Sequence, residues 1–165
     1  MKRQEGSIFK LPLNGNQWVY GRVTSPNGGI LVYDKLCHTD LTKQEILQLP
    51  ILFPTSVFKY AFSKKYNWLM VHHEPLTEAE KEIPPMYTQD KVPPFNCKIF
   101  INGGVDVIRN VPYTQCIGLQ PAVVWEPELM VERIKFYYSG EKSVWVEHLK
   151  LFNPETGEKT NWPPF

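Results

Sequence analysis

The sequence has few cysteines, and the way they are placed excludes a disulfide framework and a structural zinc site. There are only three, an odd number, and no two of them form a CxxC pair. Wide and unpaired spacing of this kind is typical of free thiols in a reducing compartment. We therefore expect Cys37, Cys97 and Cys116 to be reduced and to bind no metal.

The sequence also lacks a strong net charge and any long apolar run. Its formal charge is +1 at pH 7, whereas domains that bind nucleic acid usually carry a marked basic excess. No apolar run approaches the roughly 20 residues that a membrane-spanning helix needs. The N-terminal MKRQEGSIFKL has no apolar core of the kind found in secretory signals. These absences predict a soluble cytoplasmic protein.

The length and the apolar content are those of a compact globular protein. The chain has 165 residues, of which 42% are hydrophobic and 13% aromatic. A chain of this length can bury about two-thirds of its unfolded surface, so it needs no disulfide or metal to fold. No segment has the composition of a linker, and we expect a single domain over residues 1–165.

The segment with the clearest helical periodicity lies in the C-terminal third. Pro127 suits a first helical position, where its missing N–H would be unpaired anyway. Gly140 suits the left-handed residue that ends a helix. Apolar residues recur between them at three- and four-residue steps, which predicts a helix over 127–139. Its packing face is expected to contain Met130, Val131, Ile134, Tyr137 and Tyr138, and its opposite face Glu128, Glu132 and Lys135.

Alternation of apolar and polar residues predicts a β-sheet of several short strands. The turn signals at 14–16 and 25–29 join the first three strands into a meander, and Gly103-Gly104 marks a later hairpin. With the helix, the strands predict an α+β fold with a twisted, mainly antiparallel sheet. The strands are expected at 7–13, 17–25, 30–34, 56–62, 67–72, 97–101 and 105–109.

Two further segments complete the prediction. A short helix is expected near residues 42–49, ended by Pro50. Asp40 or Thr42 could cap it, and Glu45 has the capping-box spacing from Thr42. Residues 75–95 are rich in proline and charge, and we expect a long loop there with one helical turn near Glu78. Loops of this length are usually functional or mobile.

No group of residues makes a convincing catalytic, cofactor-binding or metal site. His72 and His73 are neighbours on a predicted strand, so they point to opposite faces and cannot share one metal there. His73 with Glu74 could form an acid–base pair, but a solvated strand end is the simpler interpretation. Cys37 and His38 are also neighbours, whereas a nucleophile and its base usually meet in space from distant parts of a chain.

The aromatic residues on the predicted strands allow two interpretations. Most strand aromatics form core or cross-strand pairs, although a ligand groove or stacking platform could use the same residues. Tyr20 and Arg22 alternate onto one face of one strand, and tyrosine and arginine are favoured anchors in protein interfaces. We expect this pair to be the best exposed candidate on the meander.

Both ends of the chain resemble a known family. The segment GSIFKLPL (6–13) and the later YGRV (20–23) resemble the start of the immunity protein 26 family. GLQPAVVW (118–125), VERI (131–134) and YSG (138–140) look like that family's C-terminal signature. The segments follow one another in the order that the family has.

The resemblance leaves residues 35–97 without a counterpart, and it implies a function. It implies an α+β bacterial protein, encoded beside a polymorphic or contact-dependent toxin, that binds the toxin domain in the cytoplasm and blocks it. The family brings no catalytic residue, so the protein would be a stoichiometric inhibitor and not an enzyme. The alternative is a small β-rich module that binds nucleic acid or a peptide. Many such toxins attack nucleic acids, so the toxin could be a nuclease.

An inhibitor of a nuclease would present acidic and aromatic groups to a basic active site. Three surfaces of the chain are candidates, although a merely solvated helix face is the alternative for the first. In order of preference they are Glu126, Glu128 and Glu132 on the predicted helix, then Tyr20, Arg22 and Tyr33 on the meander, then Glu78, Glu80 and Glu82 in the 75–95 loop.

Overall fold

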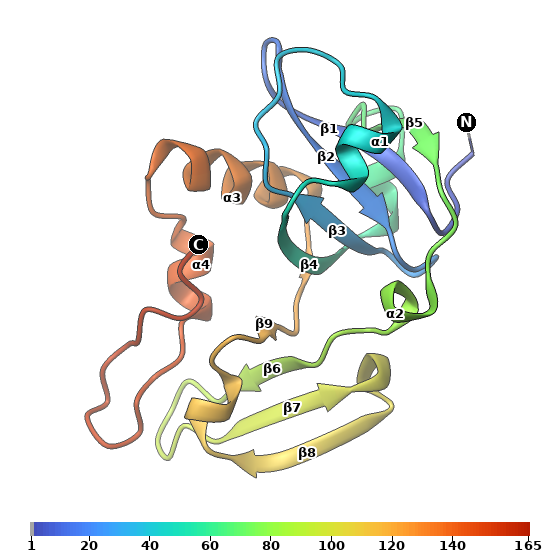
Figure 1. Cartoon of the computed structure of the whole chain (residues 1–165). Coiled ribbons are helices and arrows are strands. Elements are labelled where there is room, and N and C mark those ends of the chain that lie inside the picture. Colours follow the sequence, from blue (N-terminus) through green and yellow to red (C-terminus); the bar gives the residue numbers. More distant parts are fainter. Residues whose placement is uncertain (1) are drawn as a thin grey trace. The chain divides into compact units, whose positions relative to one another are not determined.

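The computed structural model describes residues 2–165 and divides the chain into two compact units (Figure 1). The first unit consists of the chain through Lys81 together with Val123–Tyr138, and the second of Glu82–Ala122 and Ser139–Phe165. Each unit is thus built from two separated segments, and no single linker divides the sequence. The assignment of one domain to residues 1–165 stays a prediction.

The first unit contains a six-stranded sheet in the order β10-β4-β3-β2-β1-β5. All neighbouring strands are antiparallel except β10 and β4, which are parallel. The meander of the first three strands and its two turns are as predicted. The strands are β1 (Ser7–Asn14), β2 (Gln17–Val23), β3 (Gly29–Tyr33), β4 (Ile51–Val57), β5 (Leu69–His73) and β10 (Val124–Trp125).

One predicted strand of this sheet, at 56–62, is wrong. The strand β4 lies earlier, and a 3-10 turn, η1 (Lys59–Phe62), occupies most of the predicted range. The early part of β4 contains Pro54, and proline donates no ladder hydrogen bond. The structure tolerates Pro54 because β10 pairs with β4 only at Ser56 and Val57. Pro54 therefore has no strand beside it on that side.

Two short helices begin at capping boxes. In α1 (Lys43–Leu47) the Thr42 side chain accepts from the Glu45 N–H, and the Glu45 carboxylate accepts from the Thr42 N–H, as predicted. The single turn α2 (Glu78–Lys81) repeats this arrangement with Thr77 and Glu80. Both helices thus satisfy their first backbone N–H groups within four residues of chain.

The long helix α3 (Pro127–Ser139) has the predicted bounds. Met130 and Ile134 are fully buried, so the predicted packing face is confirmed there. At the C-terminal end, Tyr137 and Tyr138 donate to the two carboxylate oxygens of Asp34 at 2.9 and 3.1 Å. These hydrogen bonds fasten the helix to the residue that follows β3.

Arg133 on the same helix is buried, which the helical pattern did not suggest. Only 1% of it is exposed, and its guanidinium carbon lies 3.9 Å from the ring centroid of Phe53 and 4.9 Å from that of Trp125. Stacking on two aromatic rings partly replaces the hydration that the cation loses on burial.

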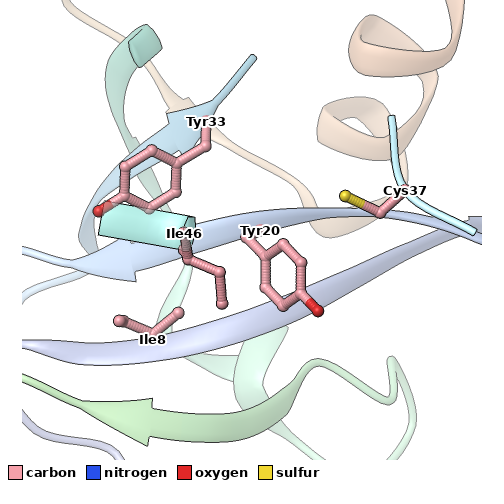
Figure 2. Close-up of a cluster of buried hydrophobic side chains, with 5 residues drawn as sticks. All are labelled: Ile8, Tyr20, Tyr33, Cys37 and Ile46. Carbon is pink, nitrogen blue, oxygen red and sulfur yellow. The ribbon is translucent and has the colours of Figure 1, made fainter. Parts of the chain in front are cut away.

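One side of the meander is covered by α1. Figure 2 shows the side chains that meet there, one or more from each of the first three strands, the loop after β3 and the helix. All are at most 3% exposed, so this region is a true core. The cluster consists of Ile8, Tyr20, Tyr33, Cys37 and Ile46.

The second unit contains a separate four-stranded sheet in the order β8-β7-β6-β9. The α+β class is therefore confirmed, but the strands form two sheets and not one. The hairpin of β7 and β8 is as predicted, with η2 (Asn102–Gly104) as its turn. The other elements are β6 (Met86–Gln89), β7 (Cys97–Ile101), β8 (Asp106–Val111), η3 (Tyr113–Cys116), β9 (Gln120–Pro121) and α4 (Val144–Leu149).

The predicted loop at 75–95 was wrong in part, because it contains β6. This strand has only four residues and lies between proline pairs, so its alternation was hard to recognise. It buries Tyr87, which packs with Cys97, Ile99, Cys116 and Leu151 in the core of the second unit.

Candidate protein-binding surface

The first predicted surface lies at the start of α3. The side chain of Glu128 is 56% exposed, whereas Glu126 and Glu132 are half-buried. The Glu128 carboxylate accepts a hydrogen bond from the Tyr66 hydroxyl at 2.9 Å and pairs with the Lys65 ammonium at 3.3 Å. The backbone amide of Glu128 and then these two partners lower the pKa of its carboxyl group. Glu128 is thus an ionised group with a lysine beside it, and not part of an all-acidic patch.

The second predicted surface, on the meander, is not exposed. Tyr20, Arg22 and Tyr33 are 1%, 2% and 3% exposed, so the expectation of an open tyrosine–arginine pair was wrong. Strand β2 is buried on both faces from Val19 to Val23. Side chains on either face of this strand therefore point into the protein, and none of them reaches solvent. The Tyr20 hydroxyl contacts the Asp40 carboxylate at 3.3 Å and accepts from the Leu41 N–H at 3.1 Å.

Arg22 forms an ion pair and two hydrogen bonds within the first unit. Its guanidinium pairs with the Glu80 carboxylate at 2.5 Å and donates to the backbone carbonyls of Glu74 and Pro75, each at 2.9 Å. Burial raises the pKa of the Tyr33 hydroxyl, and the nearby Arg22 charge only partly opposes this effect. Arg22 therefore holds the chain around α2 in place, whereas Tyr20 holds the segment before α1.

The third predicted surface does not present three free carboxylates. Glu80 faces Arg22, and Glu78 pairs with Lys81 at 2.6 Å on the surface of α2. Glu82 is exposed and belongs to the second unit. Burial raises the pKa of Glu80, but hydrogen bonds from Thr77 and the charge of Arg22 outweigh it and lower the value overall.

An aromatic cluster lies on the surface beside Glu128, and it was not predicted from the sequence. Phe58 and Tyr60 are 40% and 44% exposed, and their rings stack with centroids 5.5 Å apart. The Tyr60 ring lies 6.0 Å from that of Tyr66, over which the Lys65 ammonium lies at 4.6 Å. The signal was the interleaving of lysines and aromatics in FKYAFSKKY (58–66), which resembled a strand followed by a polar turn.

The histidines and cysteines that were weighed as catalytic or metal-binding residues are not grouped into such a site in the described part of the chain. Among residues 2–165, no group of three or more histidine, cysteine, aspartate or glutamate side chains could hold a metal ion. A ring nitrogen of His73 lies 3.1 Å from the Glu5 carbonyl oxygen. Cys37 is buried, and burial raises the pKa of its thiol, which disfavours the reactive thiolate.

In the described part of the chain, no helix is long and apolar enough to cross a membrane.

Comparison of the sequence with models of known protein families shows which family the chain belongs to. The family model described as immunity protein 26 matches residues 4–98, which is 95 of the 165 residues. The chain belongs to the immunity protein 26 family. No curated protein and no solved structure gives a significant match.

The matched region differs from the one that the sequence motifs indicated. It includes the N-terminal segments at 6–13 and 20–23, as expected, but also residues 35–97, for which no counterpart had been recognised. The C-terminal segments between 118 and 140 lie outside it, so their resemblance to the immunity protein 26 family stays a prediction. The aromatic cluster at 58–66 lies inside the matched region.

Proposed function

We propose that this chain is an immunity protein that binds a cognate bacterial toxin domain in the cytoplasm and blocks it by stoichiometric binding. The observation that carries the proposal is the match to the immunity protein 26 family over residues 4–98. In this proposal the toxin belongs to a polymorphic or contact-dependent system encoded beside the chain, and nuclease activity is one form that the toxin takes.

Two features support binding without turnover. The polar residues that first suggested a functional surface are used by the fold, as Arg22 with Glu80 and Tyr20 with Asp40 show. An exposed group of interacting aromatic and charged side chains, around Phe58 and Tyr60, has the aromatic centre and polar edge of a protein interface. Aromatic anchors surrounded by polar groups carry much of the binding energy of protein complexes.

The proposal also covers the extent of the domain and the contact residues. The matched region runs from the first unit into the second, because residues 82–98 belong to the second, which supports one functional domain over residues 1–165. Glu128, with Glu126 and Glu132 on the same helix, remains a proposed set of contact residues. Glu128 is the most exposed of the three and adjoins the aromatic cluster.

Co-expression tests the proposal. The toxin domain encoded beside this chain is produced from an inducible promoter in cells that also contain the chain. We expect these cells to grow, while cells with an empty vector or with an unrelated immunity protein die. If the cells die although the chain is soluble and in molar excess over the toxin, the proposed function is wrong.

A further inference from the structure

Three aromatic side chains form a continuous ladder on the surface of the first unit. We call Phe58, Tyr60 and Tyr66 the aromatic patch. Their rings follow one another at centroid distances of 5.5 and 6.0 Å, and the Tyr66 hydroxyl donates to Glu128. The backbone holds the patch in place, because the Phe58 N–H donates to the Trp125 carbonyl at 3.1 Å and the Ala61 N–H donates to the Phe58 carbonyl at 2.9 Å.

The core of the unit does not need these rings. The same segment supplies its inward side chains at Ala61, which is fully buried, and at Phe62. Phe62 packs edge-on against Phe9 and Trp68 at 5.3 and 5.5 Å. Single exposed aromatics are ordinary, but Tyr60 contacts both the exposed Phe58 and the half-buried Tyr66, and such a row of rings on one surface is typical of a site that another molecule covers.

The charges around the patch indicate the chemistry of that molecule. Lys59, Lys64 and Lys65 are all exposed in the same nine-residue segment, and Glu128 is the acidic group in contact with it. Three positive charges and one negative charge leave a net of +2. The Lys65–Glu128 pair is exposed, and such pairs are weak, so Lys65 can exchange its partner at small cost.

We propose that the aromatic patch is the docking site for the toxin domain, which covers it with an apolar pocket bordered by carboxylates. This inference rests on the proposed function and specifies its contact surface. A protein suits the patch better than a nucleic acid does, because the ionised Glu128 beside Tyr66 would repel phosphates, and the whole chain carries a charge of only +1. The surface of the toxin that covers the patch is therefore acidic. This differs from the basic nuclease active site for which Glu126, Glu128 and Glu132 were the predicted contacts.

Binding of aromatic variants to the purified toxin domain tests the apolar part. We expect Phe58→Ala and Tyr60→Ala each to raise the dissociation constant about tenfold or more, as central aromatic anchors do. The matched control is Ile51→Ala, which truncates a 54% exposed side chain at the start of β4, the strand that ends just before Phe58. Ile51 lies seven residues from Phe58, about 23 Å along an extended chain, and its variant should bind like the wild type.

Charge variants test the electrostatic part. The double change Lys59→Glu and Lys64→Glu should slow association, and more so at low salt, while Glu128→Lys should leave the rate unchanged or increase it. Lys35→Glu removes an exposed lysine elsewhere in the unit and serves as the control. Slower association of Glu128→Lys, with no loss from the lysine double variant, would overturn the acidic-partner inference.

The outcomes separate the two proposals. If the wild type does not bind the toxin domain, the proposed function fails and the docking site fails with it. If the wild type binds and both aromatic variants bind equally well, the function stands and the docking site is wrong. Binding of a single-stranded oligonucleotide through the patch, with toxin binding unaffected by the same substitutions, would also overturn the inference.

Discussion

The guanidinium of Arg22 on β2 is paired at 2.5 Å with the carboxylate of Glu80, which lies 58 residues later in the single turn α2. The Arg22 side chain is 3% exposed and that of Glu80 is 32% exposed. The same guanidinium holds two backbone carbonyls of the segment that leads to α2. Arg22 therefore ties both ends of the 74–80 segment to the sheet.

We expect Glu80→Gln to lower the free energy of unfolding by about 1–3 kcal/mol, because it leaves the buried Arg22 cation without its countercharge. Glu78→Gln is the matched control, since Glu78 pairs with Lys81 on the exposed surface of the same turn. That control should change the free energy by at most about 0.5 kcal/mol. Urea denaturation measures both, and equal effects would show that the buried pair contributes no more than the exposed one.

The same pair predicts a pH dependence. The folded protein lowers the pKa of Glu80 below its ordinary 4.5, so the pair stabilises the fold at a pH above that value. The contribution is lost as the pH falls through the lower folded pKa. Denaturation midpoints across this acid range should fall less steeply for Glu80→Gln than for the wild type. Parallel curves would contradict the assignment.

The buried face of α3 predicts a large effect of truncation. Ile134 is fully buried, and Ile134→Ala should cost about 2–5 kcal/mol of stability. Leu69 is 52% exposed, and Leu69→Ala should stay within about 0.5 kcal/mol as a typical surface change does. Denaturant melts of both variants check the prediction. A change below half a kcal/mol for Ile134→Ala would mean that the helix does not pack through this face.

The three cysteines should be unreactive in the folded protein. All are free and buried, and burial raises the pKa of each thiol, that of Cys116 to about 12. We expect a thiol reagent to label none of them quickly before denaturant is added and all three afterwards. Rapid labelling of the native protein, or stoichiometric zinc in elemental analysis, would contradict this expectation.

Local signals predicted α1, α2, α3 and the meander, but not α4. The Thr42–Glu45 capping box and the interval from Pro127 to Gly140 depend on neighbouring residues, and the structure has both. The sequence could not show that the strands divide between two sheets, because the pairing of β6 with β7 and β9 is decided by tertiary contacts.

The candidate site was harder to predict for the same reason. Arg22 looked like an exposed anchor because its neutralising partner, Glu80, is remote in sequence. The aromatic patch was hidden because the predicted strand at 56–62 ran through it, and strand alternation did not separate the exposed Phe58 and Tyr60 from the inward-facing Phe62.

The central claim is inhibition by stoichiometric binding, and titration of the toxin domain's activity tests it most directly. A fixed amount of active toxin is mixed with increasing amounts of the folded chain, and the remaining activity is measured. The account predicts a linear fall that ends when the two proteins are equimolar, and full activity when an unrelated immunity protein is used instead. Toxin activity that persists in the presence of excess folded chain would contradict the account.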